Sequence, residues 1–273
     1  MKIIVCVKQV PGTQAVLIDP QTHSLVREGV EAVINAYDMY AVEEALRLRE
    51  NHGGVVTALS MGIPKAADSL RHVIAMGVDE AVLLSEKTFA GADTLATAYA
   101  LSRGIRTIGE FDLILCGKQS SDGDTGQTAP SLAEKLGLPH VTQVRKIRKV
   151  EPSHLVVERV TDEGYDVIRV KLPAVLSVVK ELNKPRMASM KGRLKASGYK
   201  PLIWDAAAIG AEPELCGRAG SPTWVERTFA PKRVNLVEML SGSNEEKVSA
   251  LVDKIASMIR PKAEVNHNEY SRR

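Results

Sequence analysis

The stretch DLILCGKQSSDGDTGQTAPSLAEKLG, residues 112–137, decides the fold class because it holds three kinds of sequence in direct succession. The apolar run DLILCG has the character of a strand that is buried on both faces. A run of glycine, small hydroxyl, amide and carboxylate side chains follows, and QTAPSLAEKLG then has the apolar spacing of a helix closed by Gly137. A buried strand, a polar loop and a helix in this order predict one unit of a parallel α/β sheet.

Three similar units precede this stretch. The apolar runs KIIVCVKQV, VVTALSMG and EAVLLS each lead into a segment with helical spacing. These segments are NAYDMYAVEEALRLRE, a stretch from Pro64 to Gly77, and GADTLATAYALSRGI. Repeated strand–helix alternation predicts a doubly wound, mostly parallel sheet with helices on both faces.

After His140 the alternation of strand and helix patterns ends. The segments VTQVRKIRKV, SHLVVERV and YDVIRVKL are rich in β-branched residues and are separated by turn signals, so they predict an antiparallel meander. The run PAVLSVV then predicts one more buried strand.

The bulk composition excludes several function classes. The chain has 273 residues, 44% of them apolar, and a formal net charge of +3, which is too small to favour nucleic acid or a membrane surface. Three widely spaced cysteines without a CxxC pair indicate a reduced, cytoplasmic protein, and the scattered histidines predict no metal site. No apolar run is long enough for a membrane span, and the first residues do not resemble a secretion signal.

Polar segments follow each predicted parallel strand, and the carboxyl ends of such strands share one edge of the sheet, where α/β proteins bind ligands. The segments are VKQVPGT, SMGIP, SEKTFAGADT and GKQSSDGDTGQT. In the last of these, Gly117, Gly123 and Gly126 permit close backbone approach, and the following helix start offers N–H groups to phosphate. A well-capped surface turn explains this loop alone equally well, because short phosphate-type motifs often match by chance. The loop matches neither the P-loop nor the GxGxxG signature, which a phosphate-binding loop does not require.

GADTLAT repeats the pattern at the start of another helix. We expect Asp93 to cap this helix, and Thr94 and Thr97 to be better candidates for contact with phosphate. No nucleophile–base pair or GxSxG motif is present, so we predict no catalytic side chain. A cradle of this kind indicates a carrier in which a bound cofactor performs the chemistry.

Residues 180–200 are basic and irregular, with Gly192 and Gly198 breaking any long helix. A single aromatic residue disfavours nucleic-acid binding. Met190 and Leu194 lie four apart and predict a small apolar patch for docking to an acidic protein surface, although a solvated loop is an open alternative. From residue 201 the chain is thin in apolar residues and contains one amphipathic helix near residues 244–259, so we expect this tail to lie across another surface.

The chain resembles the β subunit of electron transfer flavoproteins. The resemblance covers nearly the whole sequence and includes VCVKQVPGT, NAYDMYAVEEALRL, CGKQSSDGDTGQT, KLPAVLSVV and LNKPRMASMKGRLKA. It implies a partner α subunit, a nucleotide- and flavin-binding α/β domain over residues 1–182, and a docking loop and C-terminal arm that wraps the partner over residues 183–273. The docking loop of the family usually has leucine where this chain has Met190.

The resemblance also implies the ligand. Ordinary members bind AMP as a structural ligand, whereas electron-bifurcating members bind a second FAD that accepts hydride from NADH. FAGADTLAT and SSDGDTGQT resemble the bifurcating group, which implies electron delivery to ferredoxin or flavodoxin and, through the α-subunit FAD, to a dehydrogenase of acyl-CoA dehydrogenase type. An AMP-binding carrier and a non-redox adenine-nucleotide-binding domain stay open as alternatives.

The predicted nucleotide site combines the candidates from the residues with those from the resemblance. It consists of Cys6, Asn35, Tyr37, Asp38, Met61, Gly62, Asp93, Thr94, Thr97, Gly117, Lys118, Gln119, Ser120, Ser121, Asp122, Gly123, Asp124, Thr125, Gly126, Gln127 and Thr128.

Overall fold

The structure of the chain is a computed structural model that describes residues 1–12, 17–18, 25–26, 31–226 and 237–259. Its contacts divide the chain into two units, Met1–Phe229 and Ala230–Arg273, and each is described by itself. None of the described helices is both long and apolar enough to cross a lipid bilayer.

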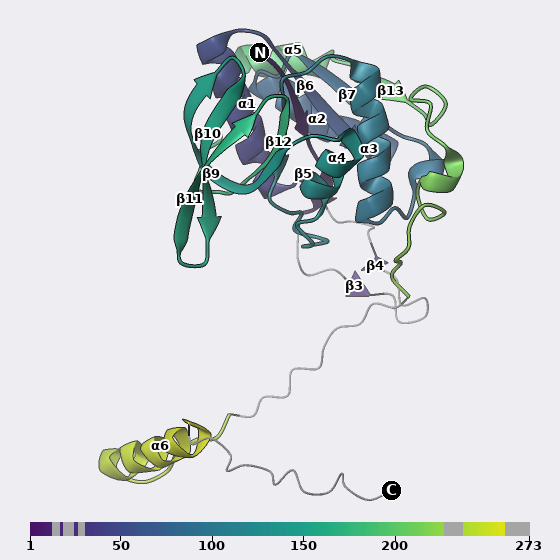
Figure 1. Cartoon of the computed structure of the whole chain (residues 1–273). Helices are drawn as coiled ribbons and strands as arrows, with labels where there is room; N and C mark the ends of the chain where they lie inside the picture. Colours follow the sequence, from purple (N-terminus) through teal and green to yellow (C-terminus); the bar gives the residue numbers. More distant parts are fainter. Residues whose placement is uncertain (13–16, 19–24, 27–30, 227–236, 260–273) are drawn as a thin grey trace, which may run out of the picture. The chain divides into compact units, whose positions relative to one another are not determined.

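The first unit is built on a nine-stranded sheet in the order β11-β10-β9-β12-β8-β1-β6-β7-β13 (Figure 1). The strands from β12 to β13 pair in parallel, as the buried apolar runs predict. Their bounds are β12 Ala174–Val178, β8 Leu113–Gly117, β1 Lys2–Cys6, β6 Val55–Met61, β7 Glu80–Leu84 and β13 Leu202–Trp204.

The predicted meander is confirmed at the other end of the sheet. β9 (His140–Glu151), β10 (His154–Thr161) and β11 (Gly164–Lys171) are antiparallel neighbours, and β9 joins the parallel part by pairing with β12. Two small antiparallel ladders, β2 (Gln9–Pro11) with β5 (Ala32–Ile34) and β3 (Leu17–Ile18) with β4 (Leu25–Val26), complete the described strands.

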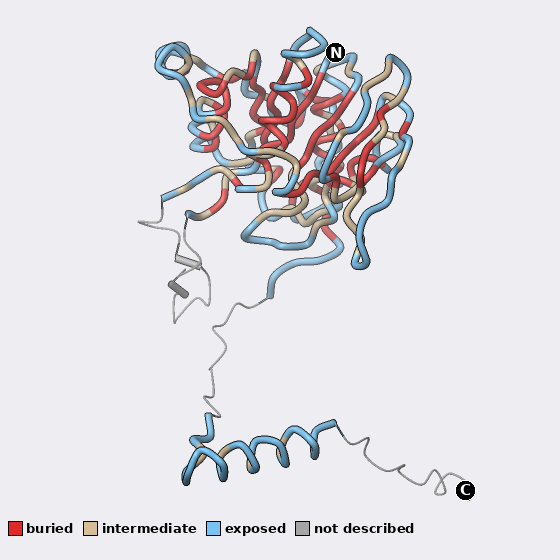
Figure 2. The backbone as a smooth tube through the Cα atoms, turned by 90° about the vertical axis from the view of Figure 1, so that its left-hand side faces the viewer, coloured by how far each residue is buried: buried red, intermediate tan, exposed pale blue. Residues whose placement is uncertain are grey.

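Helices cover both faces of the sheet, as the alternating pattern predicts (Figure 1). α3 (Thr94–Ile108) and α4 (Thr128–Leu136) pack on one face, while α1 (Ala36–His52), α2 (Ala67–Met76) and α5 (Met190–Ser197) lie on the other. The core therefore forms two apolar layers, and Figure 2 shows buried residues concentrated in the strands and the helices that cover them. Burial of these apolar side chains is the main stabilising contribution to the fold.

The segment after β12 differs from the exposed loop that the basic sequence predicts, because it contains α5. The Ser189 hydroxyl caps this helix by accepting a hydrogen bond from the Gly192 N–H at 3.0 Å. A Cβ atom on Gly192 would lie 2.0 Å from the carbonyl oxygen of Ala75, so glycine allows α5 to approach the end of α2. Ala196 is buried in this contact, and the Tyr199 hydroxyl accepts a hydrogen bond from the Ala81 N–H at 2.8 Å.

The expectation that the whole tail from residue 201 lies on another surface is wrong for residues 201–226. β13 extends the sheet by pairing with β7, and Ala206, Ile209 and Cys216 are buried against the α3 face. These few apolar residues suffice because the sheet edge already supplies most of the contact surface. In the second unit, α6 (Asn244–Ile259) confirms the predicted amphipathic helix, with Val248, Leu251, Val252, Ile255, Met258 and Ile259 exposed.

Replacing Gly192 by alanine should separate α5 from α2. The added methyl group overlaps the Ala75 carbonyl, so we expect the free energy of unfolding to fall by about 1–3 kcal/mol. Gly198→Ala is the matched control, because a Cβ atom there meets no heavy atom within 4 Å. Urea denaturation of both variants measures the difference, and equal stability of the two would contradict the close packing of α5.

Candidate nucleotide-binding site

The ends of the central strands bring most of the predicted site residues to one edge of the sheet. Cys6 at the end of β1 pairs with Leu59 of β6, and Gly117 at the end of β8 pairs with Val178 of β12. Met61 and Gly62 follow at the end of β6, while α1, α3 and α4 begin at the same edge. We call this edge, with the loop 118–127, the rim.

Asn35 precedes α1 and fastens this helix to the loop, rather than capping it through its side chain. Its amide nitrogen donates hydrogen bonds to the Asp38 Oδ1 atom at 2.9 Å and to the Gln119 carbonyl oxygen at 2.8 Å. Its amide oxygen accepts a hydrogen bond from the Ser121 N–H at 3.2 Å. The buried Asn35 side chain therefore determines where the loop begins.

Asp38 is the central buried carboxylate of the rim. Its Oδ2 atom accepts a hydrogen bond from the Lys8 N–H at 2.7 Å, which joins the segment after β1 to α1. Burial raises the pKa of Asp38 to about 7, although the bonds from Lys8, Asn35 and the Gly117 N–H act in the opposite direction. This carboxyl group gains or loses its charge near neutral pH.

Gly117 permits the contact between β8 and α1. A Cβ atom on this residue would lie 2.3 Å from the Asp38 Oδ1 atom and 2.7 Å from the Tyr37 carbonyl carbon. No side chain larger than hydrogen fits at this position without moving α1. Tyr37 itself is half-buried beside this contact.

The loop leaves the sheet with the Lys118 N–H bonded to the Val178 carbonyl oxygen at 2.9 Å. It then turns through Asp124, whose φ of 54° lies in the left-handed region, and through Gly126 with a φ of 65°. Within the described part of the chain, the N–H groups of Thr125, Gly126 and Gln127 make no hydrogen bond. These donors, directly before the first turn of α4, fit the oxygen atoms of a phosphate group.

Asp93 caps α3, as expected, by accepting hydrogen bonds from the Leu95 and Ala96 N–H groups at 2.9 and 3.1 Å. Burial alone would raise the pKa of Asp93, but the hydrogen bonds from Ala96, Thr223 and Leu95 lower it below its ordinary value. The Asp93 carboxylate therefore serves to cap the helix. The Thr94 hydroxyl, in contrast, donates a hydrogen bond to the Gln127 Oε1 atom at 3.3 Å. This contact places the starts of α3 and α4 side by side.

Lys8 is a residue of the rim that the sequence reasoning missed. Its ammonium group contacts the Asp122 Oδ1 atom at 2.6 Å and the Ser120 hydroxyl at 3.3 Å. Burial would raise the pKa of Asp122, but the hydrogen bond and the charge of Lys8, together with the hydrogen bond from Ser120, outweigh burial and lower this pKa. The sequence could have indicated Lys8, because it is a cation in the polar segment VKQVPGT that follows the first predicted strand.

Ser221 and Thr223 were also missed. The Ser221 hydroxyl accepts a hydrogen bond from the Asp93 N–H at 2.8 Å, and the Thr223 hydroxyl donates one to the Asp93 Oδ2 atom at 2.8 Å. No local pattern indicates this contact, because the residues lie far from Asp93 in the sequence.

Two of the cysteines lie at the rim. Cys6 and Cys116 are buried at the ends of adjacent strands. A hydrogen bond with Cys6, together with burial, raises the pKa of the Cys116 thiol, which keeps it protonated. Among the described residues, no three His, Cys, Asp or Glu side chains gather as a metal site.

Met190 and Leu194 lie on one face of α5, with 76% and 74% of their surface exposed. The structure does not bring them to the rim, because α5 contacts the end of α2 and the Tyr199 hydroxyl bonds near the start of β7. These features mark the opposite edge of the parallel sheet.

An ion-pair network around the buried Glu43 fastens the segment before α5 to α1. The Arg186 guanidinium bonds to Glu43 at 2.8 Å and also contacts Glu50, while Arg47 bonds to Glu43 at 2.6 Å. Burial would raise the pKa of Glu43, but the two arginines lower it. The Asn183 amide donates to the Tyr40 carbonyl oxygen at 3.0 Å. α1 therefore begins at the rim and also holds the segment that leads into α5, where Met190 and Leu194 are exposed.

Comparison with known proteins shows which family the chain is similar to. Residues 22–200 match the family described as electron transfer flavoprotein domain. The chain is 46% identical to the electron transfer flavoprotein subunit beta of Thermoanaerobacterium thermosaccharolyticum, covering 94% of this chain and 98% of that protein. It is 44% identical to the caffeyl-CoA reductase-Etf complex subunit CarD of Acetobacterium woodii, covering 93% and 98% of the two chains.

A third relative, protein FixA of Azorhizobium caulinodans, is 42% identical over 93% of this chain and 94% of its own length. The mostly parallel sheet and the matched domain place the chain among the electron transfer flavoproteins. The match to the beta subunit of Thermoanaerobacterium thermosaccharolyticum extends over nearly its full length, so the comparison also identifies the type of subunit. The chain belongs to the electron transfer flavoprotein beta-subunit family.

The buried Asp38 should make stability depend on pH. A carboxyl group with a raised pKa binds a proton more tightly in the folded chain than in the unfolded chain, so its contribution to stability is largest at low pH. This contribution is lost as pH rises from about 4, the ordinary pKa of aspartate, towards about 7, the value in the folded chain.

We therefore expect the free energy of unfolding of the wild type, minus that of Asp38→Asn, to decrease between these pH values and to level off above pH 7. Urea denaturation at a series of pH values measures this difference. A constant difference across the range would mean that Asp38 titrates normally.

Proposed function

We propose that the chain is the beta subunit of an electron-bifurcating electron transfer flavoprotein, and that its rim binds FAD. The observation that carries this proposal is the convergence of the free N–H groups before α4 with the hydroxyl at the start of α3. Two helix starts that lie side by side suit the two phosphate groups of a dinucleotide better than a single phosphate. One relative, CarD, is named as a subunit of a caffeyl-CoA reductase-Etf complex, and this name favours the same function.

The residues of the rim fit such a cofactor. We expect the pyrophosphate to bind the backbone of residues 123–128 and the hydroxyls of Thr94 and Thr97, with the adenine near Cys6, Asn35 and Met61. FAD at this site would supply hydride acceptance from NADH and division of the electrons between two acceptors. Lys8 and Asn35 hold the loop in shape, and Asp38 holds the Asn35 side chain and the Lys8 main chain in place.

The partners in this proposal follow from the family. An electron transfer flavoprotein alpha subunit forms the heterodimer and carries the second FAD. Ferredoxin or flavodoxin takes electrons at low potential, and a flavin dehydrogenase of acyl-CoA dehydrogenase type takes them from the alpha-subunit FAD. We place the complex in the cytoplasm, with residues 1–182 binding the cofactor and residues 183–273 contacting the partner proteins.

Two rivals make different predictions. A carrier that does not bifurcate binds AMP at the rim, and a non-redox nucleotide-binding domain binds adenine nucleotide without any flavin. Both use the same helix starts, so the shape of the rim alone does not separate them. The ligand content of the purified complex does.

Counting the cofactors tests the proposal. We expect the coexpressed alpha–beta heterodimer to hold two FAD molecules, measured by absorbance and by chromatography of the cofactors released on denaturation. One FAD and one AMP per heterodimer would support the simple carrier instead. Adenine nucleotide without flavin would indicate the non-redox domain.

We also propose that Met190 and Leu194 form the anchor by which the dehydrogenase docks. Both side chains are exposed, and the neighbouring Lys191 and Arg193 give the surface a positive charge that suits an acidic partner. The ion-pair network around Glu43 holds this surface in one position relative to α1.

Met190→Glu should impair electron transfer to the dehydrogenase, because a carboxylate replaces the apolar anchor. We expect the rate with the dehydrogenase to fall by about tenfold or more, in the range of a hot-spot residue, while NADH oxidation with an artificial dye stays unchanged. Leu202→Glu on β13 is the control, since Leu202 is also exposed but lies outside α5. Equal loss of both activities in Met190→Glu would assign the residue to folding.

A further inference from the structure

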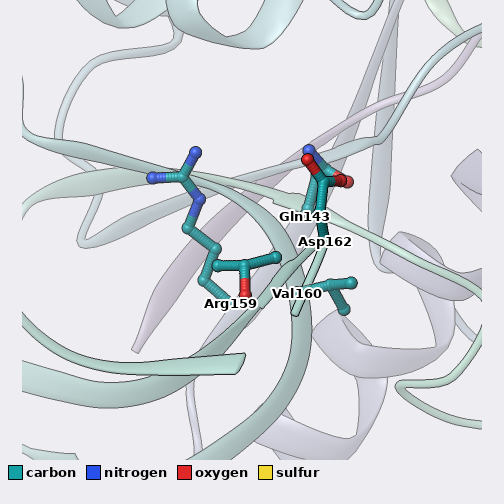
Figure 3. Close-up of a pocket in the computed structure, with 5 residues that line it drawn as sticks. Gln143, Arg159, Val160 and Asp162 are labelled. Carbon is teal, nitrogen blue, oxygen red and sulfur yellow. The ribbon is translucent and has the colours of Figure 1, made fainter. Parts of the chain in front are cut away.

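A separate pocket of about 220 Å³ lies in the meander, and the function proposed above does not use it. Its walls are Gln143, Arg159, Val160, Thr161 and Asp162. Figure 3 shows the Arg159 guanidinium on one side of the pocket and the side chains of Gln143 and Asp162 on the other. The pocket thus presents a cation, an amide and a carboxylate to a single occupant.

Arg159 lies on the face of β10 that continues the core. Side chains alternate along a strand, so Arg159 shares its face with the fully buried Leu155 and Val157. Its Nε atom is buried and has no hydrogen-bond partner among the described residues. Asp166 is its cross-strand neighbour on β11, but the two side chains form no ion pair in the described structure. An unpaired donor on a charged side chain is costly, and Arg159 also lines the pocket, so an anionic acceptor in the pocket would offset part of that cost.

Gln143 is held beside Arg159 by an irregularity of the backbone. The register between β9 and β12 shifts at this point, so that β9 has an extra residue opposite Ser177. Gln143 has a φ of 57°, unusual for a residue other than glycine, and its N–H donates to the Ser177 hydroxyl at 3.1 Å. The strained backbone is therefore fixed where the side chain lines the pocket.

The chemistry of the walls selects the occupant. Arg159 and the Gln143 amide donate hydrogen bonds to an anion, whereas the Asp162 carboxylate accepts them, so an occupant with both an anionic group and N–H donors fits better than a free phosphate. A protein segment with an acidic side chain supplies both needs, because its carboxylate binds Arg159 and its backbone N–H groups can bind Asp162.

The pocket lies on the same edge of the sheet as the rim. Val144, next to Gln143, pairs with Val178 of β12, and Val178 pairs with Gly117 of β8, where the loop 118–127 begins. Only β12 therefore lies between β9, which lines the pocket, and β8, from which this loop starts. A subunit that covers the rim is in a position to reach the pocket as well.

We propose that this pocket receives an acidic side chain of the partner alpha subunit, with Arg159 as the anchor in the subunit interface. The inference rests on the heterodimer of the proposed function, but it does not depend on which nucleotide the rim binds.

The test compares heterodimers that carry single substitutions in this chain. Arg159→Met removes the anchor, Arg159→Lys keeps the charge, and Lys146→Met removes an exposed cation from β9 outside the pocket. Dissociation on dilution is measured by sedimentation velocity. We expect the dissociation constant to rise about tenfold or more in Arg159→Met, less in Arg159→Lys, and little in Lys146→Met.

A second measurement uses the unmodified chain and covers the case in which Arg159→Met fails to fold. The Nε–H resonance of Arg159 is followed by NMR in the labelled beta chain, first alone and then in the heterodimer. We expect a large shift on heterodimer formation and no saturable shift when inorganic phosphate or acetate is added to the beta chain alone.

Equal dissociation constants for Arg159→Met and Lys146→Met, or an Nε–H resonance unchanged by the alpha subunit, would overturn the inference. Saturable phosphate or acetate binding that the alpha subunit does not displace would assign the pocket to a small free anion. A stable heterodimer with two FAD molecules but no sensitivity at Arg159 would refute this inference alone. Sensitivity at Arg159 in a heterodimer that holds one FAD and one AMP would refute only the bifurcating function.

Discussion

The architecture of the rim depends on one buried carboxyl group. Asp38 binds the main chain after β1 and the side chain of Asn35, and it lies against the backbone of Gly117. Three segments distant in the sequence are thereby joined at the point where two parallel strands end. The arrangement has a cost, because an ionised group is removed from water, and the hydrogen bonds from its neighbours offset that cost only in part. The protein retains an electrostatically unfavourable group where the loop 118–127 must begin in a defined position.

The fold could be predicted from the sequence because strands that are buried on both faces require apolar residues, which are visible in the sequence as continuous runs. Strands such as Leu113–Gly117 and Ala174–Val178 lie inside the sheet and have to be apolar along their whole length. The regions where prediction failed lack this constraint. α5 contains a glycine that intrinsic propensity counts against a helix, and only the proximity of the Ala75 carbonyl explains why glycine is required. β13 joins the sheet with just three residues, too few for a periodic pattern to appear.

The site was predictable to the extent that it follows the strands. Cys6, Asn35, Met61 and the loop after Gly117 lie at one edge because parallel strands impose it. The side-chain bonds within the rim were not predictable in the same way. Asn35 has the sequence position of a helix cap, yet it binds the loop instead, and the choice depends on a partner 84 residues away. Thr223 reaches Asp93 over a still longer separation, and no local pattern encodes such a contact.

In α5 and the segment before it, different residues support the packing and form the exposed surface, and this has an evolutionary consequence. Arg186 and Gly192 carry the packing of this region, whereas Met187, Met190 and Leu194 are largely exposed. Substitution of exposed side chains of this kind usually changes stability by about 0.5 kcal/mol or less. In the docking role that we propose, selection could therefore change which protein this surface recognises without endangering folding. On that proposal, a change of redox partner requires changes only in the exposed side chains, while the scaffold beneath them stays the same.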